Sequence, residues 1–206
     1  MRVLIRGVVA LVILIAAYWG WALAGAGQLA SAASRGDADA VMERVDLEAL
    51  IRSLSSQISR AYLDQNPELQ KLLSRHGLAQ SVVVNSAAAE MLLRAFLTPE
   101  NIAALLNQGR VGFLNGGPDA RTLWRMPPLG EAFRAHPLQA LVNSHFDGPL
   151  SFVVGLNSPD GRYNVHMSLS GATWRLSGLD IPEPVTARVA GLIAQRISGS
   201  FDLRGD

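Results

Sequence analysis

The chain has 206 residues, of which 49% are hydrophobic and 17% charged, and it contains no cysteine. This length suits one domain with an appendage, and the hydrophobic share excludes a disordered or collagen-like chain. Without cysteine, disulfide and thiolate chemistry are excluded. The 18 basic and 17 acidic residues leave a net charge of +1, so the chain lacks the basic surface of a nucleic-acid-binding protein.

The N-terminal segment has the features of an export or anchoring signal. Arg2 and Arg6 precede 28 residues, Gly7 to Ser34, that carry no charge. A helix from Val8 to Ala26 would rise about 28 Å, which is close to the thickness of a bilayer core. We therefore assign residues 1–27 to a membrane anchor or signal segment and residues 28–206 to a single exported domain.

Two interpretations of this segment remain open. As an uncleaved anchor, it would keep its arginines in the cytoplasm and place Tyr18, Trp19 and Trp21 at the outer interface. As a signal peptide, it would be cleaved at the small residues Ala24-Gly25-Ala26 or Ala30-Ser31-Ala32, releasing the domain into the periplasm. The bulky tryptophans favour the anchor. We expect a single-pass protein of the inner (cytoplasmic) membrane, with a cytoplasmic N-terminus and a periplasmic or extracellular body.

The first part of the domain, residues 37–109, has the pattern of consecutive helices. Asp37 and Asp46 are placed to cap two of them, because apolar residues recur at helical spacing after each. Thr98 and Pro99 start another helix, which ends near Gly109. Between these lies an alanine-rich run, for which we expect one helix over Leu78–Leu97.

The second part of the domain has the pattern of a sheet. Residues 110–144 are rich in glycine and proline at first and predict a loop with one short helical turn near Leu129–Phe133. Apolar and polar residues then alternate over 145–182, which predicts an antiparallel meander whose phase shifts at Gly178, as at a β-bulge. A C-terminal helix is expected over 183–198. Helices followed by a meander indicate an α+β fold.

Three stretches of the chain together resemble a bacterial family known as domain of unknown function 2939. They are the opening Gln28-Leu29-Ala30 through Leu50-Ile51-Arg52, the helix start Phe96-Leu97-Thr98-Pro99-Glu100, and the hairpin Ser170-Gly171 through Ile181-Pro182. The resemblance implies a short, membrane-anchored, exported protein of unknown function, and it transfers no catalytic residues. The order of helices and curved sheet is also similar to the cystatin-like and nuclear-transport-factor-2-like folds, and that similarity concerns the fold alone.

The motifs of common enzymes are missing from the sequence. It has no phosphate-binding loop and no nucleophile elbow, and its four histidines are scattered at positions 76, 136, 145 and 166, so we expect neither a metal nor a cofactor. His166 is the most interesting of the four. It shares a strand face with Asn164, and Arg175 lies on the neighbouring strand. A solvated outer face is the simpler interpretation of this group.

Two functional hypotheses follow from these observations. The first is a membrane-anchored cell-envelope module that binds an envelope protein or a lipid and has no catalytic activity. The second is a small cone-shaped enzyme with His166 as general base in a pocket between sheet and helices, beside Asn164 and Arg175. The two differ in what surrounds His166, since the enzyme requires a closed cavity there.

Overall fold

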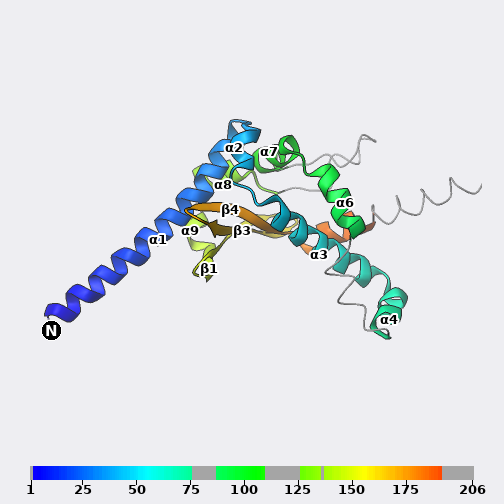
Figure 1. The fold of residues 1–206 in the computed structure, drawn as a ribbon, viewed down its shortest axis with the longest axis horizontal. Coiled ribbons are helices and arrows are strands. Elements are labelled where there is room, and N and C mark those ends of the chain that lie inside the picture. The colour runs from blue at the N-terminus through cyan, green and yellow to red at the C-terminus, as the bar shows by residue number, and fades with distance from the viewer. Residues whose placement is uncertain (1, 76–86, 110–125, 136, 192–206) are drawn as a thin grey trace, which may run out of the picture.

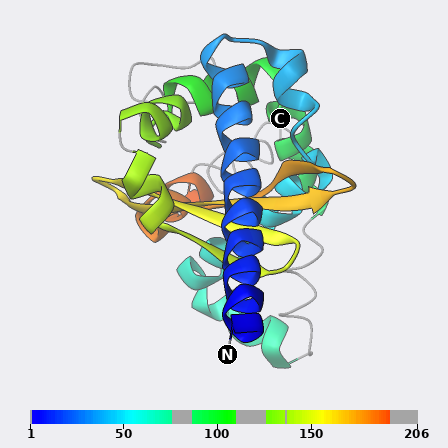
Figure 2. The ribbon, with the colours of Figure 1, turned by 90° about the vertical axis from the view of Figure 1, so that its left-hand side faces the viewer.

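The computed structural model describes residues 2–75, 87–109, 126–135 and 137–191. Its first element, α1 (Arg2–Ser34), is a single unbroken helix. The N-terminal half of α1 projects away from the rest of the molecule (Figure 1), and its C-terminal half runs past the sheet to α2 (Figure 2). Packing into the domain therefore begins before residue 28, because Tyr18 and Trp19 pack against the core and Ala22 is fully buried.

The helical part contains the following elements: α2 (Ala38–Met42), α3 (Leu47–Gln65), α4 (Pro67–Arg75), α6 (Ala87–Phe96) and α7 (Pro99–Gln108). The predicted caps are confirmed. Asp37, Asp46 and Thr98 each accept a hydrogen bond from a backbone N–H in the first turn of the following helix. Gly109 ends α7 in the left-handed conformation, with φ of 64°.

Two of the expected boundaries differ from the structure or extend past it. Of the helix expected over Leu78–Leu97, the structure describes α6, and residues 78–86 lie outside the described residues. Residues 183–191 are helical, as expected for the C-terminal helix, and the rest of that helix lies outside the described residues.

Of the loop expected over 110–144, residues 110–125 lie outside the described residues, and the short helical turn expected near Leu129–Phe133 is confirmed, but the rest of the second part is more helical than expected. That part contains two helices, α8 (Leu129–Ala135) and α9 (Pro137–Val142). The prolines in this part, which are typical of a loop, begin helices instead, because the fixed φ of proline suits a first turn and its missing N–H is not needed there. Pro128 directly precedes α8 and accepts hydrogen bonds from its first turn, and Pro137 is the first residue of α9.

The sheet is the expected antiparallel meander, in the order β1 (Ser144–Gly148), β2 (Ser151–Ser158), β3 (Gly161–Ser170) and β4 (Thr173–Asp180). The expected bulge is present. His166 pairs with Gly178 and Met167 pairs with Leu176, so that Ser177 is the extra residue. The bulge moves every later residue of β4 to the opposite face from the one that simple alternation would give.

One face of the sheet forms the core together with the helices. Its buried residues are Phe152, Val154, Leu156, Tyr163, Val165, Met167, Trp174, Leu176 and Leu179. Both α1 and α3 contact β4, and α7 and α8 pack on α1. The edge of β4 is closed by α3, because the amide of Gln57 donates to Leu179 O at 2.7 Å and accepts from Ile181 N at 2.9 Å. These bonds protect the edge from pairing with another chain.

Candidate functional site

A cluster of polar side chains lies on the face of the sheet opposite the core. Strand β3 contributes Asn164 and His166, and β4 contributes Asp180. His166 Nε2 lies 2.8 Å from Asp180 Oδ2, and Asn164 Nδ2 donates to the same oxygen at 3.2 Å. The side chain of His166 is 26% exposed and that of Asp180 is 45% exposed. A carboxylate at this distance fixes the orientation of an imidazole.

The contact between the two residues shifts both titrations. The hydrogen bond to Asp180 raises the pKa of His166 above its ordinary value, and partial burial opposes that shift. The same hydrogen bond lowers the pKa of Asp180, again against the effect of burial. The pair is therefore held with His166 charged over a wider pH range than a free histidine, a state in which it can donate a proton more readily than accept one.

Sequence reasoning placed His166 and Asn164 together but missed Asp180. The bulge expected at Gly178 could have indicated Asp180, because the change in register there puts Asp180 directly opposite Asn164. Arg175, which was expected to join the group, pairs with Ser168 two residues further along β3. No hydrogen bond joins the described side chain of Arg175 to either His166 or Asp180, and its Nε is buried without a hydrogen-bond partner.

The surroundings of His166 are partly closed. A Cβ added at Gly178, which lies opposite His166, would sit 3.1 Å from Ser53 Oγ of α3, so α3 borders this part of the face. Surface hollows of about 230, 400 and 460 Å³ occur elsewhere, and none of these three is lined by Asn164, His166 or Arg175. Within the described parts of the chain, no three His, Asp or Glu side chains are grouped so that they could hold a metal ion.

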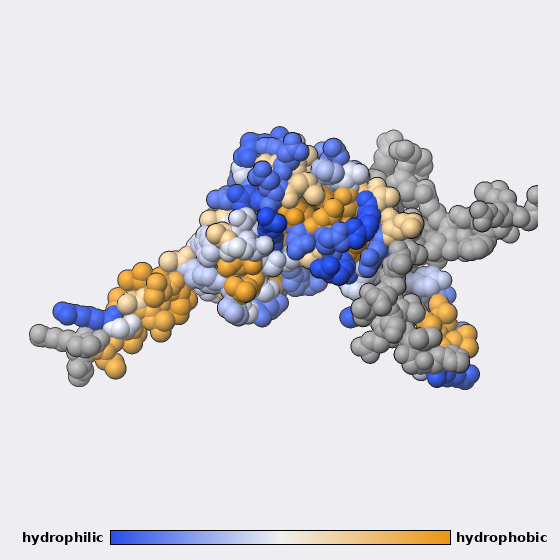
Figure 3. Space-filling model, viewed as in Figure 1, coloured by the Kyte–Doolittle hydropathy of each residue, from blue (hydrophilic) through white to orange (hydrophobic). Residues whose placement is uncertain are grey.

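The second candidate site is the projecting half of α1. Nine large aliphatic side chains there are between 51% and 74% exposed: Leu4, Ile5, Val8, Val9, Leu11, Val12, Ile13, Leu14 and Ile15. Figure 3 shows this half as an apolar rod with hydrophilic residues near its end. By length and composition α1 is long and apolar enough to cross a membrane, and only 6% of its most apolar window is buried inside the protein.

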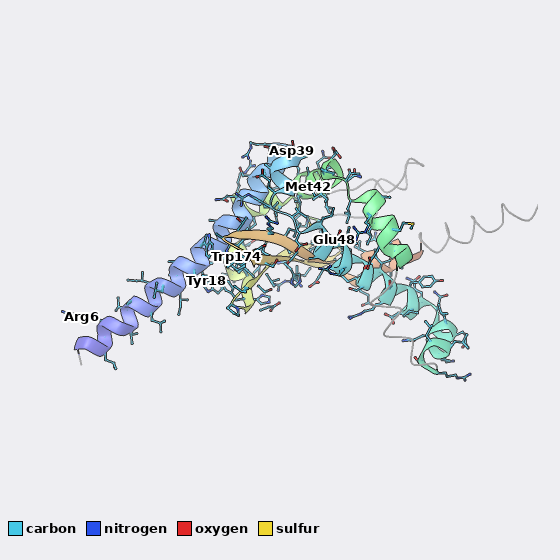
Figure 4. The ribbon with its side chains drawn as sticks, viewed as in Figure 1. Arg6, Tyr18, Asp39, Met42, Glu48 and Trp174 are labelled. Atoms are coloured by element: carbon cyan, nitrogen blue, oxygen red, sulfur yellow. The ribbon has the colours of Figure 1, made fainter. Side chains whose placement is uncertain are left out.

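An aromatic cluster marks the point where α1 enters the domain. It comprises Tyr18, Trp19, Trp21, Phe146, Phe152 and Trp174, with ring centroids 4.9 to 6.2 Å apart in the contacting pairs. Figure 4 shows Tyr18 and Trp174 close together at this junction. The hydroxyl of Tyr18 donates to the carbonyl of Pro149, between β1 and β2. Helix and sheet are thus joined where the exposed half of α1 ends.

The structure therefore defines a small α+β domain built around the second half of an apolar N-terminal helix. The family model described as a protein of unknown function (DUF2939) matches residues 11–105, so the chain is similar to that family over this region. The resemblance stated from the sequence is thereby confirmed, although its closing hairpin at 170–182 lies beyond the matched range. No curated protein and no solved structure matches the chain, and the cone-fold similarity stays a prediction.

Proposed function

We propose that this protein is a membrane-anchored module of the bacterial cell envelope that keeps α1 throughout its life. The observation that carries the proposal is the continuity of α1 with the core. Six residues of its second half are at most 2% exposed: Ala22, Ala26, Leu29, Ala30, Ala32 and Ala33. Cleavage at Ala24-Gly25-Ala26 would separate the domain from two of them, and cleavage at Ala30-Ser31-Ala32 would remove most of the set. A signal peptide has no reason to be packed in this way.

The charges at the N-terminus set the orientation that we propose. Arg2 and Arg6 precede the apolar half of α1, and positive flanks are retained in the cytoplasm. The aromatic cluster then falls at the opposite interface, where tryptophan and tyrosine are favoured. In this orientation the body lies on the periplasmic or extracellular side of the cytoplasmic membrane.

Binding of a protein or a lipid is the role that the surface supports best. The polar group around His166 lies on a sheet face rather than in one of the hollows described above, which does not favour a small-molecule reaction there. An anchor confines the domain to the membrane plane, so that even a weak contact with another envelope component becomes effective through high local concentration. The partner is accordingly an envelope protein or the lipid itself.

Three measurements test the anchor. The intact mass of protein extracted from its own membranes should equal that of the chain with residues 1–26 attached. Alkaline carbonate should leave it in the membrane pellet, and protease added to the outer face should degrade the body. A mature protein that begins near Gly27 or Ala33 would overturn the proposal.

A catalytic role for His166 is the second candidate. It is favoured by one observation, the 2.8 Å contact with Asp180, because a carboxylate that orients an imidazole is common in acid–base catalysis. A bound reactant seen as extra mass in native mass spectrometry, and lost in His166→Gln but not in the control His145→Gln, would support this role. Extra mass that is equal in both variants would count against it.

A further inference from the structure

The projecting part of α1 is short for a full membrane crossing. From Arg6 to Tyr18 the helix rises about 18 Å, whereas a bilayer core is about 30 Å thick and needs about 20 helical residues. A span that begins at Gly7 would therefore extend to about Ala26. Ala26 is already 1% exposed inside the domain. Snorkelling of Arg6 recovers only part of the difference.

Because the projecting part of α1 is shorter than the bilayer core is thick, the end of the domain next to it must lie at the membrane surface. The turn between β1 and β2 lies against α1 at the point where its projecting part ends, because Tyr18 donates to the carbonyl of Pro149 and stacks on Phe146 with ring centroids 5.2 Å apart. The next residue, Leu150, is 58% exposed. An apolar side chain at the tip of a hairpin, held at the level where the helix leaves the bilayer, is suited to the boundary between headgroups and acyl chains.

We propose that the β1–β2 turn, Gly148–Leu150, is a second membrane contact that inserts Leu150 into the outer interface of the bilayer that holds α1. The inference rests on the proposed anchoring. The carboxylate next to the turn does not oppose insertion, because Asp147 lies 3.2 Å from Nε2 of His145, and His145 points to the opposite face from Phe146. The domain is thereby fixed in tilt and rotation as well as tethered.

The absence of cysteine makes the test direct, since each variant then carries a single thiol. Full-length Leu150→Cys is labelled with an environment-sensitive fluorophore and reconstituted into phosphatidylcholine vesicles with and without brominated acyl chains. Ile13→Cys, at a site 61% exposed on α1, is the positive control. Pro159→Cys is the negative control, because Pro159 is exposed in the turn between β2 and β3, at the opposite end of β2.

The proposal requires the probe at position 150 to be blue-shifted and quenched by brominated lipid, while the probe at 159 is neither. If the probe at position 150 is neither blue-shifted nor quenched, like the probe at position 159, while the probe at position 13 is quenched, then Leu150 does not insert and only the anchor is supported. A blue shift at 150 that brominated lipid does not quench indicates cover by protein and also overturns it. If brominated lipid does not quench the probe at position 13, the proposed anchoring of α1 is overturned, and so is the insertion of Leu150 that rests on it.

Discussion

The two halves of α1 share one backbone conformation but have different surroundings. Leu11 and Leu14 in the first half are 57% and 67% exposed, whereas Leu29 in the second half is fully buried. The first half carries large aliphatic residues, and the second is mostly alanine and glycine. Small side chains let neighbouring elements approach the helix closely, which is why the second half packs inside the domain and the first does not.

The comparison shows why hydropathy alone misplaces a domain boundary. Both halves are apolar, and no charge occurs from Gly7 to Ser34, so by length and composition they form one candidate span, Leu4–Ser34. A lipid-facing helix needs only apolar side chains, whatever their shape. The side chains of a core helix must also fit the space between the neighbouring elements. Residue size within the apolar stretch therefore separates the membrane part from the domain part.

Truncation should give the largest effect and sets the boundary directly. Removing residues 1–17 leaves the buried half of α1 intact, so we expect that the remaining chain unfolds cooperatively. Removing residues 1–26 deletes Ala22, Ala26 and half of the aromatic cluster, a loss comparable to the whole stability of a domain, about 5–15 kcal/mol. Thermal unfolding followed by near-UV circular dichroism distinguishes the two. Equal transitions in both chains would show that residues 18–26 are not part of the core.

Leucine-to-alanine substitutions compare the two halves at matched chemistry. Leu29→Ala leaves a cavity at a fully buried site and should cost about 2–5 kcal/mol of unfolding free energy. Leu11→Ala removes the same atoms from a side chain that projects outside the domain core. The unfolding free energy of the domain in detergent should therefore stay unchanged. Denaturant unfolding of both variants measures the difference. A similar loss in both would contradict the division of α1.

Glycine substitutions test how closely the second half is packed. A Cβ added at Gly25 would lie 2.7 Å from Cβ of Trp174, whereas one added at Gly27 meets nothing within 4 Å. Gly25→Ala should therefore cost about 1–3 kcal/mol through overpacking. Gly27→Ala should stabilise the helix by up to about 1 kcal/mol through propensity. Differential scanning calorimetry reports both, and effects of the same sign would show that α1 and β4 are less closely packed than described.

The sequence predicted local features well because they depend on neighbouring residues. Asp37, Asp46, Thr98 and Gly178 each act as expected, since caps and bulges follow from short-range hydrogen bonding and backbone freedom. The helix α8 was expected only as a short turn and α9 was missed, because a proline that begins a helix and one that ends it look alike in a single sequence.

The candidate site was harder to predict because it depends on register. Asp180 joins His166 only after the extra residue Ser177 shifts the later part of β4 by one position. Arg175 precedes the bulge and therefore pairs with Ser168 instead. The contact of Gln57 with the edge of β4 had no signal in the sequence, since it joins residues more than 120 positions apart.

The two faces of the sheet also differ in their surroundings, as the two halves of α1 do. One face is packed in the core, and the other carries the partly exposed polar pair His166 and Asp180. His166 has a raised pKa, so its contribution to stability is complete below its ordinary pKa of 6.5 and is lost as pH rises through the raised value. Asp180 has a lowered pKa, so its contribution is complete above its ordinary pKa of 3.8 and is lost as pH falls through the lowered value. The pair should therefore stabilise the fold most between these two ordinary values.

The size of this effect is limited by solvent, since Asp180 is 45% exposed, and we expect less than about 1 kcal/mol. Urea unfolding at about pH 5.5 and about pH 8.5 should show lower stability at the higher pH. His166→Gln should remove the part of that difference which the pair supplies. The control is His145→Gln, whose partner Asp147 is 51% exposed and whose own side chain is 54% exposed, and it should leave the difference unchanged. Equal behaviour of the two variants would mean that the contact between β3 and β4 contributes no more than an exposed ion pair.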